Sequence, residues 1–246
     1  MKNEPMEVER AKALAVFTYQ MSAMIDVGFC LGMIVETLSD AAPPPYDEFC
    51  RPISARWKQK ENECLALSTI MEERPELFPD FYIKTIRCGE IGGVWHHIGE
   101  LAELLGDTLR IWSARGRPLE WIKLLLSPAA QQVQEWSQLD DGQRKLVLYL
   151  FCKSFGMMLS AGVPLARAGE TAACFLPAKQ RESFRADMAE YTVRREEQIS
   201  SWLANTPYAD AFLVRMVYDG ETCGTLDSVM EKAALVYQRQ LEIESA

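Results

Sequence analysis

The sequence has few of the residues on which catalytic and metal sites usually depend. Its 246 residues include only two histidines, His96 and His97, and these are adjacent. Neighbouring residues on a helix point about 100° apart, so both rings cannot face one metal ion, and no His-Glu-x-x-His spacing accompanies them. The sequence also has no Walker-type phosphate loop and no nucleophile-elbow glycine pattern around a serine or cysteine. It therefore does not favour zinc binding, ATP hydrolysis or a histidine-dependent hydrolase.

Long uncharged segments and a surplus of basic residues are lacking as well. The longest windows without charge, 13–25 and 154–166, hold 13 residues each, whereas a helix needs about 20 apolar residues to cross a bilayer. The first ten residues contain no apolar segment of a secretory signal. A net charge of −9 repels phosphate backbones and anionic lipid headgroups. We therefore expect a cytoplasmic protein without a membrane span and without a nucleic-acid partner.

Cysteine is present but not in a pattern typical of a disulfide framework or a metal site. The seven cysteines are an odd number, are scattered along the chain and form no Cys-x-x-Cys pair. Such spacing is typical of reduced thiols in an intracellular core. Composition is otherwise that of a globular protein, with 48% hydrophobic and 25% charged residues.

An internal repeat is the strongest signal that is present. Placing Gly28 on Gly162, an offset of 162 − 28 = 134, also pairs Phe17, Met24, Leu31, Glu36 and Thr37 with Phe151, Met158, Leu165, Glu170 and Thr171. Further on, Gly89-Glu90-x-x-Gly93 matches Gly220-Glu221-x-x-Gly224 at an offset of 220 − 89 = 131. The difference of three residues is the size of a loop change. Two blocks in the same order predict two copies, at about 10–106 and 144–242.

Apolar residues follow helical spacing within each copy. In the first copy Phe17, Met21, Met24 and Ile25 occupy one face, and the second copy repeats this set. No alternating strand pattern is found, so we predict an all-α fold of two tandem six-helix bundles. The expected domains are a first bundle at 1–106, a partly helical connector at 107–143, and a second bundle at 144–246. We expect the charged segment from 46 to 64 to be a solvated helix.

The repeated glycines are expected to shape the ends of helices. Gly28 and Gly162 lie where a helix should stop, and Gly89 and Gly220 are predicted to end later helices in the left-handed region. Gly93 and Gly224 would then allow a second tight turn. We expect the intervening Glu90 and Glu221 to lie near free amides at the start of a helix. Thr225 is the expected N-cap of the last helix.

These motifs resemble the type II secretion system F domain. The resemblance rests on Phe17, Gln20, Met24, Gly28, Leu31 and Glu36, on Pro75 to Phe81, on Gly89-Glu90-x-x-Gly93, and on the matching residues of the second half, including Ala161 to Leu165 and Gly220-Glu221-x-x-Gly224. That family supplies inner-membrane platform proteins of type II secretion and type IV pilus machines. Its members have two six-helix cytoplasmic domains separated and followed by transmembrane helices. The resemblance therefore implies a platform-like protein that lacks those helices.

The resemblance implies a non-enzymatic scaffold that docks an assembly ATPase or another platform component, and it places the protein at the inner membrane through such partners. No cofactor or metal is predicted, because the acidic ligands that some family members use at an interface cannot be matched here. A metal- or small-molecule-binding helical enzyme that reuses the fold is the alternative. A homodimer and a monomer whose halves imitate a dimer both stay open. The residues expected to contact a partner or to hold the structure are Gly28, Glu36, Gly89, Glu90, Gly93, Gly162, Glu170, Gly220, Glu221 and Gly224.

Overall fold

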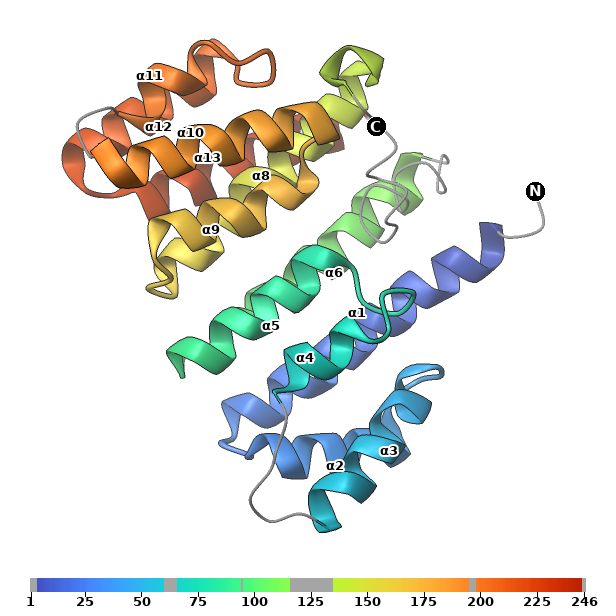
Figure 1. Ribbon diagram of the computed structural model, residues 1–246. Helices are drawn as coiled ribbons and strands as arrows, with labels where there is room; N and C mark the ends of the chain where they lie inside the picture. Colours follow the sequence, from blue (N-terminus) through green and yellow to red (C-terminus); the bar gives the residue numbers. More distant parts are fainter. Residues whose placement is uncertain (1–3, 60–65, 94, 116–134, 195–197, 245–246) are drawn as a thin grey trace. The chain divides into compact units, whose positions relative to one another are not determined.

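The fold is all-α, as predicted. The computed structural model describes residues 4–59, 66–93, 95–115, 135–194 and 198–244, and within these ranges it has twelve α-helices, two short 3-10 helices and no strand (Figure 1). The chain forms two compact units, Met1–Ile122 and Lys123–Ala246. Each unit has its own core and is described by itself.

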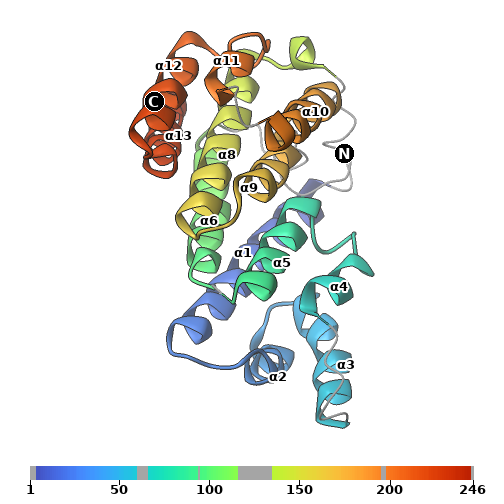
Figure 2. The same ribbon diagram turned by 60° about the vertical axis from the view of Figure 1, so that its left-hand side comes forward.

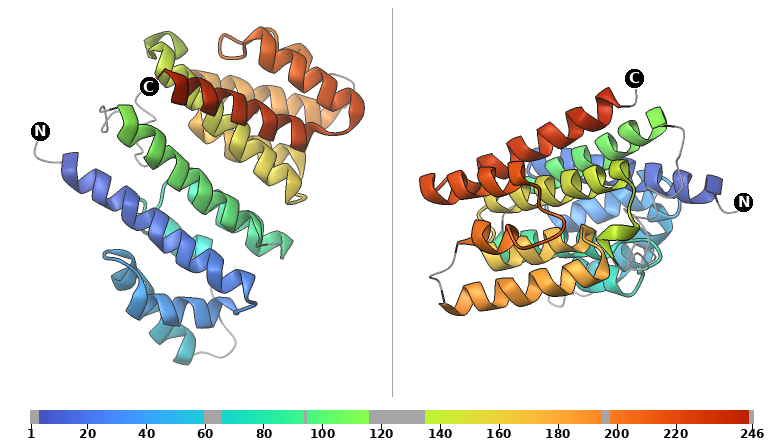
Figure 3. Two further views of the ribbon diagram at one scale, coloured as in Figure 1. Left: turned by 180° about the vertical axis from the view of Figure 1, so that it is seen from behind. Right: turned by 90° about the horizontal axis from the view of Figure 1, so that it is seen from above.

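The first unit is built on a long helix pair. Its helices are α1 (Glu4–Asp26), α2 (Leu31–Ala41), α3 (Tyr46–Gln59), α4 (Leu67–Glu72), α5 (Asp80–Gly92) and α6 (His97–Arg115). α1 and α6 lie side by side, and α2 packs against α3 (Figure 3). Aromatic side chains fill the centre, with ring centroids of Phe17 and Tyr46 5.0 Å apart and those of Phe49 and Phe78 4.7 Å apart. These buried rings join α1, α3 and the segment before α5.

The second unit has the same number of described α-helices. They are α8 (Asp141–Ser160), α9 (Leu165–Ala172), α10 (Ala178–Arg194), α11 (Ile199–Leu203), α12 (Ala211–Cys223) and α13 (Leu226–Ile243), with the 3-10 helices η2 (Trp136–Gln138) and η3 (Ala173–Phe175). α8 and α13 make the most extensive helix contact, and α9 lies between α8 and α10 (Figure 2). Phe151 lies in the core, and its ring centroid is 5.4 Å from that of Phe184 and 5.8 Å from that of Phe155.

The predicted helix stops at Gly28 and Gly162 are confirmed. Both glycines have positive φ angles, 87° and 75°. The amide of Gly28 donates to the Ile25 carbonyl oxygen at 2.9 Å, and that of Phe29 to the Met24 carbonyl oxygen at 3.0 Å. This bonding pattern is the Schellman motif, in which a left-handed residue satisfies the last carbonyls of a helix. The amides of Gly162 and the following residue make the same two bonds.

Two expectations about burial were wrong. The segment from 46 is not a fully solvated helix, because α3 buries Tyr46, Phe49 and Ile53 on one face and continues through Pro52. Not every cysteine is a core thiol. Cys50 and Cys152 are buried, but two others, Cys30 and Cys223, are exposed. The exposed pair flank helix ends, where the chain turns at the surface.

Helices occupy the described ends of the expected connector, 107–143. Residues 107–115 are the last part of α6, η2 covers 136–138, and α8 begins at Asp141. Residues 116–134 lie outside the described part of the chain. α8 starts with a capping box, since the Asp140 side chain accepts from the Gln143 amide at 2.8 Å and the Gln143 side chain accepts from the Asp140 amide at 2.9 Å.

Candidate functional site

Gly89 and Gly220 do not end helices, which corrects the prediction. Both lie inside a helix, α5 and α12 respectively, and both are buried. A Cβ at Gly220 would lie 3.1 Å from Val229 Cβ and 3.2 Å from Leu226 Cα, both on α13. A Cβ at Gly89 would lie 2.9 Å from the ring of Trp95. Glycine is therefore needed here for close approach of the following segment, not for a left-handed backbone.

The left-handed residues of the motif are Gly93 and Gly224. Their φ angles are 65° and 69°, and each follows the last residue of its helix. The Thr225 amide donates to the Gly220 carbonyl oxygen at 2.9 Å, which closes this corner. Thr225 occupies the N-cap position of α13, as expected, but its side chain makes no capping hydrogen bond. The last glycine of the motif thus forms the turn, and the first allows the helices to meet.

The glutamate of the second motif binds the start of a short helix. Glu221 accepts hydrogen bonds from the Ile199 amide at 2.6 Å, from the Ser200 amide at 3.0 Å and from the Ser200 hydroxyl at 2.8 Å. The first of these reaches one carboxylate oxygen and the other two reach its partner. We call this arrangement the second glutamate clasp. It joins α12 to the first turn of α11.

The first motif makes the same kind of contact in the first unit. Glu90 accepts from the Leu67 amide at 2.5 Å and from the Ser68 hydroxyl at 2.5 Å. The Ser68 amide also points at this carboxylate, with nitrogen–oxygen distances of 3.3 Å and 3.4 Å. We call this the first glutamate clasp. It joins α5 to the first turn of α4.

The clasps replace the missing caps of two short helices. The residues before α4 and α11 are Ala66 and Gln198, and neither makes a side-chain capping hydrogen bond. The first amides of a helix have no partner inside it, and the helix dipole favours a negative charge at that end. Helices of six and five residues are also too short to be stable alone. A carboxylate from another helix therefore supplies both the acceptors and the charge.

Glu36 and Glu170, which the repeat also pairs, are not part of the clasps. Both are exposed, on α2 and α9. Glu36 forms an ion pair with Lys58 at 2.6 Å, which links α2 to α3. Because both partners are more than half exposed, this ion pair contributes little to stability. The ten predicted residues are thus spread over helix ends, two clasps and two exposed positions.

Of the two histidines, His97 is part of the packed interior and His96 is exposed. His97 is 1% exposed and its Nε2 lies 3.1 Å from the Thr85 carbonyl oxygen. Burial lowers the pKa of His97, the bond to Thr85 opposes this, and the neighbouring His96 lowers the pKa further. A neutral ring therefore packs beneath Gly89, where a Cβ would lie 3.1 Å from its Cε1. Across the described ranges, no group of three histidine, cysteine or acidic residues could hold a metal ion.

Two serines of the clasps were not among the predicted residues. Ser68 and Ser200 are the hydroxyl donors of the clasps, and they lie 90 − 68 = 22 and 221 − 200 = 21 residues before their glutamates. The shared signal is a serine at the second position of each short helix. Without the tertiary contact that signal has no evident meaning, since serine is a common residue at helix starts.

A comparison with known protein families finds a match within the second unit. Residues 151–246 match the family described as type II secretion system (T2SS), protein F. A search of curated proteins gives no match to the chain. None of the described helices is both long and apolar enough to span a bilayer. The matched region begins within α8, runs through α13 and includes the whole second clasp, so the similarity to the type II secretion system protein F family covers residues 151–246.

Proposed function

We propose that this protein is a non-enzymatic scaffold that docks the cytoplasmic assembly ATPase of a type II secretion or type IV pilus machine. The observation that carries the proposal is the family match over residues 151–246, because members of this family are platform proteins that act through protein contacts. The fold is compatible with such a role, since it presents exposed helix faces. In this proposal the protein works in the cytoplasm and reaches the inner membrane through its partners.

The two halves, 1–106 and 144–246, act in this proposal as two copies of one unit joined by the connector 107–143. Support comes from the clasps, in which a glutamate accepts from two consecutive amides and one serine hydroxyl in either unit. Further support comes from positive φ angles at Gly28, Gly93, Gly162 and Gly224. A chance resemblance would not be expected to repeat both the residues and their bonding.

The Gly-Glu-x-x-Gly elements have a structural role in this proposal. They hold α4 and α11 in place, and partner contacts are made by exposed side chains nearby. On α12, the large side chain of Tyr218 is 42% exposed. Aromatic residues that are exposed on one partner commonly anchor protein interfaces. We assign the ATPase contact to the exposed side of α12 that carries Tyr218.

Copurification tests the proposal. The tagged full-length protein, expressed in its own cells, should retain the assembly ATPase, and Tyr218→Ser should weaken that binding about tenfold or more. Glu182→Gln, on an exposed position of α10, is the surface control and should bind normally. Failure of the unaltered protein to retain the ATPase, in extract and with purified components, would overturn the proposal. Equal binding by Tyr218→Ser would instead reject the α12 surface alone.

A further inference from the structure

A cavity of about 550 Å³ opens in the second unit, and its lining shares no residue with the second clasp. Its walls come from η2, from the first turns of α8 and α10, and from the loop after α11. The residues that matter here are Trp136, Arg144, Lys179, Gln180, Thr206 and Tyr208. Small-molecule sites in proteins commonly have volumes of about 300 to 1,000 Å³. The size therefore suits a ligand as large as a nucleotide.

The wall of this cavity has a hydrogen-bond donor without an acceptor. The Arg144 Nε is buried and has no hydrogen-bond partner among the described residues, and the Tyr208 hydroxyl, also buried, interacts with the Thr206 side chain. Tyr208 is 2% exposed. Burial is the main cause of its raised pKa, a hydrogen bond with the Thr206 side chain lowers this pKa, and the charge of Asp187 raises it, so the hydroxyl keeps its proton. A buried donor without an acceptor costs free energy, which a bound oxyanion would recover.

The charge of the cavity also favours an anion. Its charged residues are Arg144, Lys179 and Glu135, which gives 2 − 1 = +1 in a chain of net charge −9. Lys179 Nζ lies 3.1 Å from the Glu135 carboxylate on the rim, and its side chain is 71% exposed. Arg144 is the inner cation, and its guanidinium lies 5.9 Å from the centre of the Trp136 ring.

Rigid contacts hold these groups in place. The Trp136 amide donates to the Gln180 side-chain oxygen at 3.2 Å, which fixes η2 against α10. The rings of Trp136 and Tyr208 meet edge to face with centroids 6.1 Å apart. The cavity is therefore preformed, and binding would not have to order its wall.

We propose that this cavity binds a small organic anion through its phosphate or carboxylate group, with Arg144 and the Tyr208 hydroxyl donating to the oxygens. The fork of an arginine side chain matches both groups. Trp136 would contact the apolar or ring part of the ligand. The proposal is independent of the docking of an ATPase, because the cavity shares no residue with the exposed side of α12.

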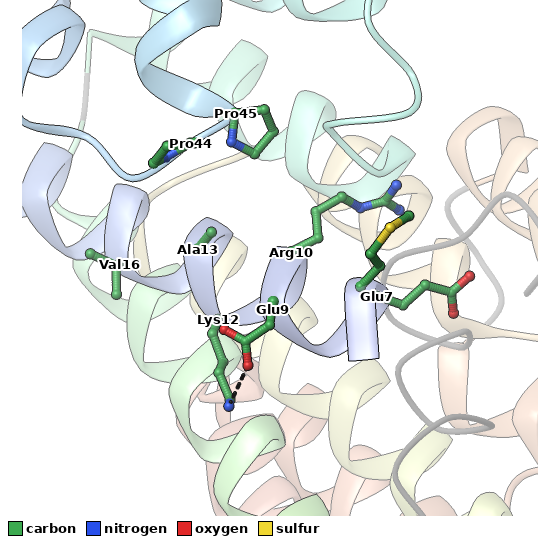
Figure 4. A pocket seen from close by; sticks show the side chains of 9 residues that line it. Glu7, Glu9, Arg10, Lys12, Ala13, Val16, Pro44 and Pro45 are labelled. Atoms are coloured by element: carbon green, nitrogen blue, oxygen red, sulfur yellow. Dashed lines mark hydrogen bonds and ion pairs between the residues drawn. The ribbon is translucent and has the colours of Figure 1, made fainter. Parts of the chain in front are cut away.

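The first unit provides an internal control. It has a cavity of about 700 Å³ beside Arg10, which lies 144 − 10 = 134 residues before Arg144 (Figure 4). The position equivalent to Lys179, at the same offset of 134 residues, is Pro45, which carries no charge. The charged lining residues are Glu7, Glu9, Arg10 and Lys12, which gives a net charge of zero, and Glu9 is paired with Lys12 at 2.9 Å. This cavity should not bind anions.

Isothermal titration calorimetry on the full-length protein tests the proposal with three probes: inorganic phosphate, adenosine monophosphate and benzoate. We expect one-to-one binding, with adenosine monophosphate tighter than phosphate if the ligand is a phosphate ester, and benzoate tighter than phosphate if it is a carboxylate. Arg144→Gln and Tyr208→Phe should each weaken binding roughly tenfold. Tyr208→Phe keeps the buried ring, and far-UV circular dichroism checks that both variants fold.

Arg10→Gln removes the same charge from the first unit and should leave the affinity unchanged. Lys179→Gln, at an exposed position, should weaken binding by a smaller factor and keeps the test open if Arg144→Gln fails to fold. The proposal is overturned if no probe binds at millimolar concentration, or if Arg10→Gln lowers the affinity as much as Tyr208→Phe does.

Discussion

The second glutamate clasp should stabilise its unit strongly, and Glu221→Gln tests this. The amide keeps the size of the side chain but replaces one acceptor oxygen with a donor. That change removes either the bond to the Ile199 amide or the two bonds to Ser200, and it removes the charge at the start of α11. Hydrogen bonds to a charged group contribute about 1.5 to 3 kcal/mol each. Because the carboxylate is only half-buried, we expect a total loss of about 2 to 4 kcal/mol.

Urea unfolding followed by circular dichroism measures this loss. With a denaturant slope of about 2 kcal/mol per molar for a unit of this size, the midpoint should fall by roughly 1 to 2 M. Hydrogen exchange should show faster exchange at the Ile199 and Ser200 amides in particular. The control Glu170→Gln, on an exposed position, should stay within about 0.5 kcal/mol.

A double-mutant cycle makes the test specific. Combining Glu221→Ala, which removes both carboxylate oxygens, with Ser200→Ala should give a coupling energy of about 1 kcal/mol, because both substitutions break the same hydroxyl contact. Glu221→Gln that unfolds at the same urea concentration as Glu170→Gln would refute the view that the clasp holds α11. A coupling energy of zero would show that the serine hydroxyl does not belong to the clasp.

Three further predictions follow from the structure. Gly220→Ala should destabilise the second unit by about 1 to 3 kcal/mol in urea unfolding, because its Cβ would press on α13. Gly32→Ala has open space around it and should be neutral or stabilising; equal losses would contradict the close-packing argument. The lowered pKa of His97 means that the unfolded chain binds more protons, so stability should fall as pH drops below about 6.5, and His97→Gln should flatten that slope in thermal unfolding at pH 5 to 8. A thiol reagent followed by mass spectrometry should label exposed Cys223 rapidly and buried Cys152 only on unfolding, and fast labelling of Cys152 would count against the core of the second unit.

Local sequence signals predicted the helices well. The spacing of Phe17 and Met21 gave the buried face of α1, where both residues are almost fully covered. Gly28 and Gly162 marked the ends of α1 and α8, because a left-handed residue at a helix end is a local requirement that glycine meets. The resemblance to the F domain also rested on such local motifs, and the match over 151–246 supports it.

The meaning of Gly89 and Gly220 could not be read from the sequence. A glycine near a helix end serves either a left-handed turn or a close contact, and the two requirements look alike in one sequence. In the structure both glycines serve a close contact, because atoms of the next helix or turn lie about 3 Å from where a Cβ would be. Within the two Gly-Glu-x-x-Gly motifs, the glycines with positive φ are Gly93 and Gly224, at which we expected a second turn.

The helical content, the spacing of the apolar faces and the glycine stops at 28 and 162 could be predicted without a structure, since each depends on residues within a few turns of one another. The folded chain was needed to show that Glu221 caps a helix beginning 22 residues earlier, and that Arg144 and Tyr208 line one cavity. Contacts of that kind depend on how helices pack. Side-chain spacing along the chain carries no direct record of that packing, so residues distant in sequence acquire their roles only in the folded unit.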